Sequence, residues 1–209
     1  VAKTTTAMNL AAALIKKKKT AALIDMDPQG SLSLAMGLDL TKIDATMKEL
    51  LTGEAYTPEV VQRRGEIPFF PAKINLAELE LQLASEMGRE RRLESVMKEV
   101  TGPDFMLIDC PPQLGLLTTN ALIYADEVLI PTTADYLAIS GLSYLIETMK
   151  KVRNLGLNDN LSLNGVLITN FDARKNIQSE IQKKLKKEFG TKLYKTEIRT
   201  NNSLAEAPA

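Results

Sequence analysis

A lysine followed by three threonines opens the sequence and has the chemistry of a phosphate-binding loop. In such loops backbone N–H groups surround the phosphates, a lysine contacts the β and γ oxygens, and a hydroxyl reaches a bound Mg²⁺. Lys3 and Thr4 have the residue types for these two side-chain roles. The full signature also contains an earlier glycine, which would precede Val1. Taken alone, the Lys-Thr pair is also compatible with an ordinary polar start of a helix.

Two apolar runs, each ending in aspartate, supply the acids that phosphate chemistry needs. The run Thr20–Asp25 leads into Asp27, and the run Phe105–Asp109 ends in a single aspartate. Such runs are typical of buried parallel strands, and ligands of open α/β sheets bind at the carboxyl edge of the strands. We therefore expect Asp25 and Asp27 to face the site of Lys3, and Asp109 to hold a water of a Mg²⁺ shell.

The rest of the chain alternates predicted strands with predicted helices. Thr4–Lys17 carries one apolar stripe, as a helix that covers a sheet requires. Pro68 predicts that Ile67–Phe70 is an edge strand or the start of a strand. The alternation predicts an α/β fold with a mostly parallel, twisted sheet and helices on both faces. The other expected strands are 127–130 and 164–169, and the other expected helices are 31–39, 47–51, 58–63, 75–87, 91–100, 115–124, 141–153 and 176–189.

Length and composition limit the function further. The 209 residues, 44% of them hydrophobic, suit a single α/β domain over 1–209 with a sizeable core. The net charge is formally zero, so any contact with nucleic acid must come from a local patch. The absence of histidine excludes histidine-based catalysis, and one cysteine excludes an internal disulfide and indicates a reducing cytosol. No apolar stretch approaches the length of a membrane span.

Three sequence elements together resemble one family. They are Lys3-Thr-Thr-Thr-Ala-Met-Asn-Leu-Ala-Ala-Ala, then Leu23-Ile-Asp-Met-Asp-Pro-Gln-Gly, then Asp109-Cys-Pro-Pro. These elements resemble the ParA/Soj-type partition ATPases, which belong to the deviant Walker A group of P-loop NTPases. The resemblance covers essentially the whole chain. It also implies that the sequence is a fragment, which lacks the strand before the phosphate loop and the elements after Leu204–Ala209.

The resemblance implies an ATPase that needs Mg²⁺ and holds ATP between two subunits of a homodimer. Phosphate binding would involve Ala2, Lys3, Thr4 and Thr5, and Mg²⁺ would be organised by Thr4 and Asp109. Asp27 would orient the attacking water. Asp25 would assist, by bonding to Lys3 or through the water shell of the metal. Asn170 lies in the stretch that would contact the adenine.

The resemblance also implies partners and a location. The ATP-bound dimer would bind DNA without sequence preference, and a ParB-type centromere-binding protein would stimulate hydrolysis and release. The protein would be cytoplasmic and associated with the nucleoid, with no membrane contact expected.

A basic stripe is the candidate DNA contact. The helix 176–189 places its apolar residues on one face and its lysines elsewhere, and a solvated helix surface is the alternative explanation. Thr200 and Ser203 stand where many relatives carry arginines, which weakens the expectation of strong DNA binding. The candidate residues are Arg174, Lys183, Lys184, Lys186, Lys187, Lys195 and Arg199.

Ala2 departs from the family pattern, which has glycine directly before the lysine. If this position requires a positive φ, the Cβ is unfavourable, and we expect weaker nucleotide binding or hydrolysis. Ala2 therefore favours an alternative function as a nucleotide-independent scaffold, whereas Asp27 and Asp109 argue against it. A relative that positions protein clusters or organelles is a further alternative. A nitrogenase-type reductase would need two cluster cysteines per subunit, and only Cys110 is present.

Overall fold

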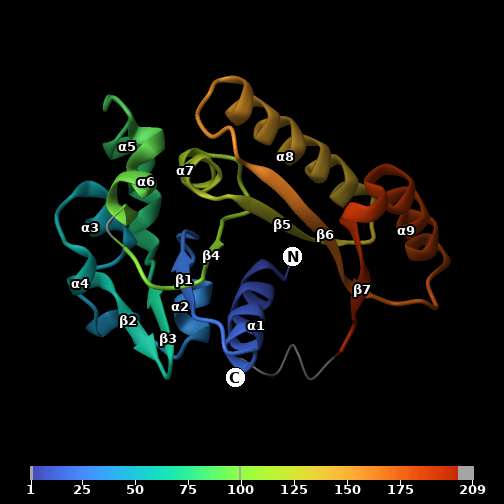
Figure 1. Cartoon of the computed structure of the whole chain (residues 1–209), viewed down its shortest axis with the longest axis horizontal. Coiled ribbons are helices and arrows are strands. Elements are labelled where there is room, and N and C mark those ends of the chain that lie inside the picture. The colour runs from blue at the N-terminus through green and yellow to red at the C-terminus, as the bar shows by residue number, and fades with distance from the viewer. Residues whose placement is uncertain (1, 99, 202–209) are drawn as a thin grey trace. The chain divides into compact units, whose positions relative to one another are not determined.

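The computed structural model describes residues 2–98 and 100–201 and shows a mixed α/β protein (Figure 1). Val1, Ser203 and the segment Leu204–Ala209, which entered the sequence predictions, lie outside the described residues. The described chain forms two compact units. One comprises residues 4–124, and the other comprises residues 125–201 with residues 2 and 3. The expectation of a single domain stays a prediction.

The first unit is built on a four-stranded sheet in the order β2-β3-β1-β4. Strand β1 (Ala21–Asp25) pairs in parallel with β3 (Ile67–Phe70) and with β4 (Phe105–Asp109). Strand β2 (Gln62–Arg64) is antiparallel to β3. The mostly parallel sheet expected from the sequence is thus confirmed. The register pairs Asp25 with Asp109, so the two strands end side by side in acids.

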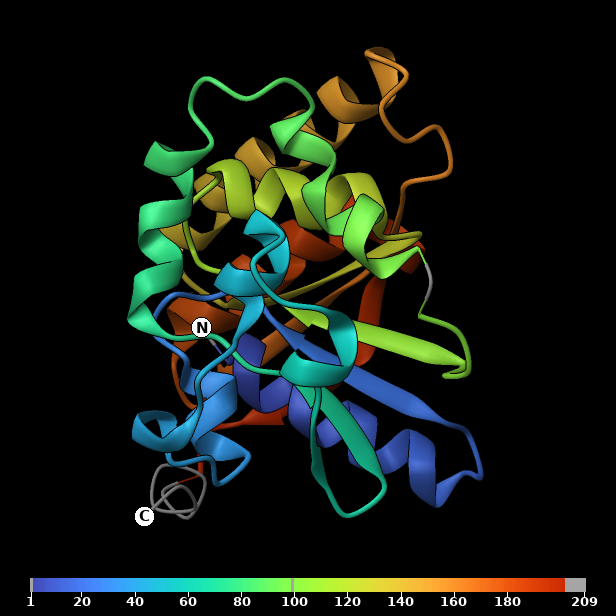
Figure 2. The same cartoon turned by 90° about the vertical axis from the view of Figure 1, so that its left-hand side faces the viewer.

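Helices cover both faces of this sheet because successive strand residues point to opposite sides. Leu23 of β1 packs in a buried cluster with residues of α1 (Lys3–Lys16) and α2 (Ser31–Ala35). Its neighbour Ile24 packs in a second cluster with residues of five other α-helices. Figure 2 shows the dark-blue α1 and the green helices on opposite sides of the blue strand β1. The helices of the second cluster are α3 (Met47–Thr52), α4 (Thr57–Val60), α5 (Leu79–Gln82), α6 (Arg92–Met97) and α7 (Leu116–Tyr124).

Three sequence predictions for this unit were wrong in part. Strand β3 is not an edge, because β2 pairs with it. Pro68 is tolerated there because β1 pairs only with Phe69 and Phe70, so that ladder does not need the N–H that proline lacks. The helix expected over 75–87 ends early, at Gln82. The helix expected over 58–63 ends at Val60, because residues 62 and 63 pair with β3 as part of β2. The remaining elements are η1 (Leu40–Lys42), η2 (Ile74–Glu78) and η3 (Arg89–Arg91).

The second unit contains a parallel sheet in the order β5-β6-β7. Its core joins apolar residues of β5 and β6, such as Ile130 and Ile168, to Ile181 and Leu185 of α9. Helix α9 has the bounds expected from the sequence, whereas α8 begins five residues earlier than the expected Gly141, and β7 was not predicted. The elements are β5 (Glu127–Thr133), α8 (Tyr136–Asn154), β6 (Ser162–Phe171), α9 (Asn176–Phe189), η4 (Gly190–Lys192) and β7 (Leu193–Arg199).

Among the helices that the structure describes, none combines the length and the apolar character that crossing a membrane requires.

Candidate functional site

Thr4 and Asp109 meet at the end of the parallel strands. Thr4 lies in the first turn of α1, and its Oγ1 donates a hydrogen bond of 2.6 Å to Oδ2 of Asp109. Hydroxyl and carboxylate oxygens are the ligands that Mg²⁺ prefers, and Mg²⁺ commonly takes only one or two of them from a protein. Within residues 2–98 and 100–201, no three His, Cys, Asp or Glu side chains gather into a metal site. The pair therefore fits a Mg²⁺ whose other ligands are phosphate and water oxygens.

Asp25 occupies a different environment from Asp109, although the two residues are paired in the sheet. It is fully buried, and its Oδ2 accepts hydrogen bonds from the backbone N and the Oγ of Ser33, at 3.0 and 2.7 Å. Its Oδ1 accepts a bond of 3.1 Å from the backbone N of Asp27. Both oxygens thus hold the loop after β1 and the start of α2. The catalytic assignment of Asp25 stays a prediction.

Burial raises the pKa of Asp25 from 3.8 to about 7, and the nearby charge of Asp109 adds to this rise. The hydrogen bonds from Ser33 and Asp27 favour the charged form of Asp25 and therefore oppose this rise of the pKa. In an unfolded chain the carboxyl group would titrate near its ordinary value. The folded state therefore keeps a proton on Asp25 in a pH range where the unfolded state has lost it.

This raised pKa predicts that the free energy of unfolding falls as pH rises from about 4 to about 7. The contribution of Asp25 is fully present below the unfolded pKa and is lost as pH passes the folded pKa, with an upper limit of about 4 kcal/mol. Urea unfolding at pH 4.5 and pH 8 measures this difference. We expect Asp25→Asn to reduce the difference and Asp39→Asn, at an exposed acid of lowered pKa, to leave the decline in place. An unchanged difference in Asp25→Asn would contradict the assignment.

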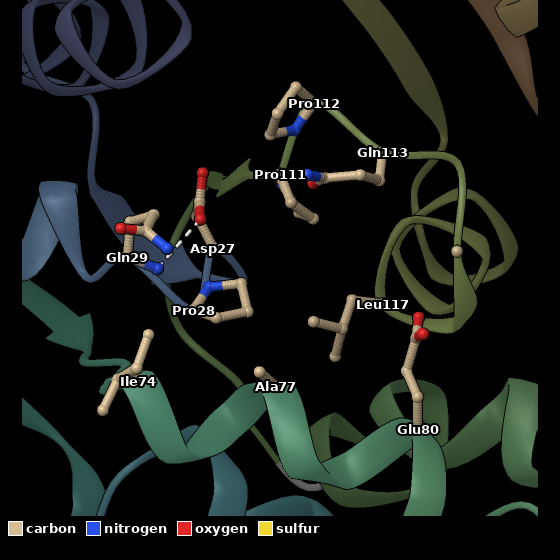
Figure 3. Close-up of a pocket in the computed structure, with 11 residues that line it drawn as sticks. Asp27, Pro28, Gln29, Ile74, Ala77, Glu80, Pro111, Pro112, Gln113 and Leu117 are labelled. Atoms are coloured by element: carbon tan, nitrogen blue, oxygen red, sulfur yellow. Dashed lines mark hydrogen bonds between the residues drawn. The ribbon is translucent and has the colours of Figure 1, made fainter.

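Asp27 is half-buried and lines a cavity of about 450 Å³ (Figure 3). Its Oδ1 accepts a bond of 3.0 Å from the backbone N of Gln29, which the dashed line marks. The cavity lies between the loop after β1, the loop after β4 and the segment η2–α5. Asp27 can therefore reach water, whereas the buried Asp25 cannot. The lining residues are Asp27, Pro28, Gln29, Ile74, Ala77, Glu80, Pro111, Pro112, Gln113, Gly115 and Leu117.

Glu80 of α5 fixes the far end of the loop that follows β4. Its carboxylate accepts a hydrogen bond of 2.6 Å from the backbone N of Leu116, the first residue of α7. A Cβ at Gly115 would lie 2.3 Å from Oε1 of Glu80, so this close approach depends on glycine. Sequence reasoning missed Glu80 because it lies between two leucines of a predicted helix, where a glutamate is ordinary, and is separated from Leu116 by 36 residues.

The residues at the start of the chain combine a left-handed backbone at Ala2 with a helix that begins at Lys3. Ala2 has a φ of 60°, in the left-handed region that disfavours a Cβ. Lys3 begins helix α1, whose first turn contains no acidic residue. Thr5 is exposed, and its carbonyl oxygen accepts a bond of 2.8 Å from Asn9. Free N–H groups and the helix dipole favour an anion at such a terminus. The binding roles of these residues stay predictions.

The strained backbone of Ala2 predicts that Ala2→Gly binds ATP about 5- to 10-fold more tightly. Glycine adopts a positive φ without strain, so the loop would hold this conformation more often, and a gain of about 1 kcal/mol gives this factor. Lys18, at φ 61° just after α1, is a matched control, because Lys18→Gly relieves the same kind of strain at the other end of the helix. Fluorescent-nucleotide titration measures both variants. Equal affinity of wild type and Ala2→Gly would contradict the prediction.

Asn170, the candidate for the adenine contact, belongs to the second unit. It lies near the end of β6, is exposed and has a φ of 54°, a conformation that asparagine tolerates better than most residues. Its Oδ1 accepts a hydrogen bond of 2.9 Å from Thr200. The contact with adenine stays a prediction.

The basic candidates of the second unit are exposed, but they differ in their contacts. Arg174 forms two hydrogen bonds of 2.9 Å to Asp172, which hold the pKa of that carboxyl group at about 2. Lys184 lies 4.7 Å from the ring centroid of Tyr136. Lys186 donates a bond of 3.3 Å to the carbonyl of Gly190. The candidates that lie exposed on α9 or β7 without such a contact among the described residues are Lys183, Lys187, Lys195 and Arg199.

Comparison with known proteins agrees with this fold. A family model described as an AAA domain matches residues 1–163. The chromosome-partitioning ATPase Soj of Treponema pallidum is 40% identical over 212 residues, which cover 100% of this chain and 82% of that protein. The chromosome partitioning protein ParA of Caulobacter vibrioides is 36% identical over 215 residues, covering 100% of this chain and 80% of that protein.

Solved structures show the same fold. The cobyrinic acid a,c-diamide synthase of Mycobacterium smegmatis superposes with a TM-score of 0.89 at 31% identity, over 99% of this chain and 85% of that chain. Its form with bound ADP and magnesium gives a TM-score of 0.84 at 33% identity, over 90% and 78% of the two chains.

The parallel strands that end in acids, together with a helix that begins at Lys3-Thr4, define a P-loop NTPase fold. Within that class, the chain belongs to the ParA/Soj family of partition ATPases.

Proposed function

We propose that this partition ATPase binds ATP with Mg²⁺, dimerises on ATP, binds DNA without sequence preference and hydrolyses ATP when a ParB-type partner stimulates it. The observation that carries the proposal is the hydrogen bond of 2.6 Å between Thr4, directly after Lys3, and Asp109. It brings a hydroxyl and a carboxylate together at the start of a helix that favours phosphate. The names of the Soj and ParA relatives support the partition role.

Each residue of the site has a distinct task in this proposal. The helix N-terminus and Lys3 bind the phosphates, with Ala2 and Thr5 beside them, and Asn170 contacts the adenine. Thr4 and Asp109 hold Mg²⁺, which would neutralise phosphate charge when bound. The magnesium in the ADP-bound structure of the M. smegmatis relative supports this assignment. The catalysis consists of positioning and charge neutralisation.

Asp27 has the task of orienting the attacking water. Its carboxylate lines the cavity and is half-buried, so water can reach it (Figure 3). Asp25 is fully buried, and the loop and α2 occupy both of its oxygens. We therefore assign catalytic contact with water to Asp27, and assign to Asp25 the support of the loop that carries it.

DNA binding is assigned to the exposed basic residues of the second unit. Lys183, Lys184 and Lys187 lie on α9, and Lys195 and Arg199 lie on β7. Alternate residues of a strand share a face, so Lys195 and Arg199 point the same way, with Glu197 between them. Glu180 and Glu188 also lie on α9, so the stripe is mixed in charge. We expect weak DNA contact by one subunit, doubled in a dimer, and a location in the cytoplasm at the nucleoid.

DNA retention at fixed salt with ATP, with ADP and without nucleotide tests the proposal. We expect retention only with ATP, and weaker retention as salt rises. The variant Lys183→Glu/Lys187→Glu should lose retention while it keeps ATP binding. Equal retention in all three nucleotide states, or none in any state, would overturn the proposal.

A second candidate is a scaffold of the same fold that works without nucleotide turnover. The φ of 60° at Ala2 favours it, because a Cβ is strained there and stands where phosphates would approach. This candidate predicts that wild type neither binds nor hydrolyses ATP and that Ala2→Gly restores at least binding. The same titration therefore separates the two candidates. If the protein instead positions protein clusters or organelles, the identity of that cargo would be set by the partner protein.

A further inference from the structure

Ser33 is a fully buried polar residue near the start of α2 that joins three segments of the first unit. Its Oγ donates a hydrogen bond of 2.7 Å to Oδ2 of Asp25 and accepts one of 3.0 Å from the backbone N of Ala72. Its own backbone N donates to the same carboxylate oxygen at 3.0 Å. The hydroxyl thus bridges the end of β1 to the segment that follows β3.

The buried position makes the hydroxyl of Ser33 hard to replace. Ala72 is also fully buried, so without the hydroxyl its N–H would lose its acceptor inside the protein. A buried donor without an acceptor is unfavourable, since it has lost its hydrogen bond to water. Asp25 would at the same time lose one of its donors and move more freely. Its only other partners among the described contacts are the backbone N–H groups of Ser33 and Asp27.

The same contacts continue from Asp25 to Asp27. Oδ1 of Asp25 accepts from the backbone N of Asp27 at 3.1 Å, and the carbonyl of Asp27 accepts from the backbone N of Gly30 at 2.9 Å. Gly30 lies against the same residue that Ser33 binds, because a Cβ there would be 2.8 Å from the carbonyl oxygen of Ala72. The loop that carries Asp27 therefore lies close against Ala72 at Gly30, and the helix that follows the loop is hydrogen-bonded to Ala72 through Ser33.

We propose that Ser33 is a positioning residue for Asp27, acting through Asp25 and through its bond to Ala72. Ser33 itself touches neither substrate nor water of the reaction. The inference rests on the proposed function for the task of Asp27. In this proposal, the buried hydroxyl of Ser33 determines how accurately the loop places the carboxylate of Asp27 at the cavity.

The test compares Ser33→Ala with Thr46→Ala, a closely matched control. Thr46 is also fully buried, and its Oγ1 donates a bond of 2.7 Å to a carboxylate, that of Glu49. Among the described residues, the side chain of Thr46 forms no hydrogen bond to the loop after β1. We expect Ser33→Ala to lower kcat about tenfold or more, with KM for ATP changed by less than about threefold, because a small misplacement of a catalytic group lowers the rate strongly. We expect Thr46→Ala to keep both constants, and Ser33→Thr, which retains the hydroxyl, to keep most of kcat.

Two further measurements keep the outcome decisive. If Ser33→Ala does not fold, Ser33→Cys takes its place, since a thiol is of similar size but a weak hydrogen-bond partner. Amide hydrogen exchange over Asp27–Gly30 should be faster in the Ser33 variant than in Thr46→Ala. If wild type hydrolyses no ATP, the proposed function fails, and the exchange rates alone decide the inference. Unchanged exchange, or an equal loss of kcat in Thr46→Ala, would overturn it.

Discussion

Asp27→Asn is expected to bind ATP as tightly as wild type and to hydrolyse it at least about 100-fold more slowly. Asparagine has the shape of aspartate, and its side-chain oxygen can still accept from the backbone N of Gln29. The bond from the backbone N of Asp27 to Asp25 does not involve the side chain and should persist. The substitution therefore removes only the charge that faces the cavity. Single-turnover hydrolysis and fluorescent-nucleotide titration measure the two quantities.

Asp39→Asn is the matched control for this substitution. Asp39 is an exposed aspartate whose Oδ1 also accepts from a backbone N two residues later, that of Thr41, at 3.1 Å. It has the local geometry of Asp27 without a place at the cavity, so its variant should hydrolyse ATP at the wild-type rate. Wild-type hydrolysis in Asp27→Asn would remove Asp27 from the reaction. Weakened binding in that variant would instead assign Asp27 to nucleotide affinity.

Asp109→Asn is expected to lose the dependence of ATP hydrolysis on Mg²⁺, with a rate lower by about 100-fold or more. The amide oxygen can still accept from Thr4, so the pairing of α1 with β4 should persist. The charge of Asp109 raises the pKa of Asp25, so the two acids repel one another when both are ionised. We therefore expect the nucleotide-free variant to be more stable than wild type at pH 8. Thermal unfolding and a Mg²⁺ titration of turnover measure both effects.

Asp104→Asn should give the opposite pattern. Asp104 is an exposed acid that accepts from the backbone N and the hydroxyl of Thr20, at 2.8 and 3.0 Å, before β1 begins. Its loss should lower stability and leave turnover unchanged. A fall of stability and activity together in Asp109→Asn would indicate that Asp109 supports the fold and does not hold the metal.

The parts of the fold that the sequence predicted well are those in which local pattern and burial agree. Strands β1 and β4 are continuous apolar runs that end in an acid, and they pair with one another in parallel. Strand β1 is buried along its whole length, whereas β4 ends the described sheet and is only partly buried before Asp109. Helix α9 repeats apolar residues every four positions, and its buried residues Ile181 and Leu185 lie on that stripe. In these segments the local pattern of apolar residues alone predicts both the type of element and its bounds.

The elements that were missed depend on residues distant in the sequence. Strand β7 is exposed along most of its length, and only its pairing with β6 makes it a strand. Helix α8 starts at Tyr136 because the side chain of Asp135 accepts from the backbone N of Ala138. The apolar stripe from Leu142 onward could not reveal that cap.

The candidate site was predicted in its residue types but not in its arrangement. The motif Asp25-Met26-Asp27 indicated two acids at one edge, yet it could not say that the first is buried and bonded to Ser33 while the second faces a cavity. Ser33 and Glu80 carry no local signal, because each acts on a backbone N–H more than 30 residues away. The strain suspected at Ala2 depended on a positive φ, which the structure contains.

The loop between Asp109 and Leu116 is held at both of its ends. The carbonyl of Asp109 accepts from the backbone N of Met26 at 2.8 Å, and the N–H of Leu116 donates to Glu80. Pro111 and Pro112 restrict the backbone in between. Any large shift of this loop must therefore break one of these two bonds, so a rearrangement at the cavity is coupled to the loop after β1 at one end and to α5 at the other.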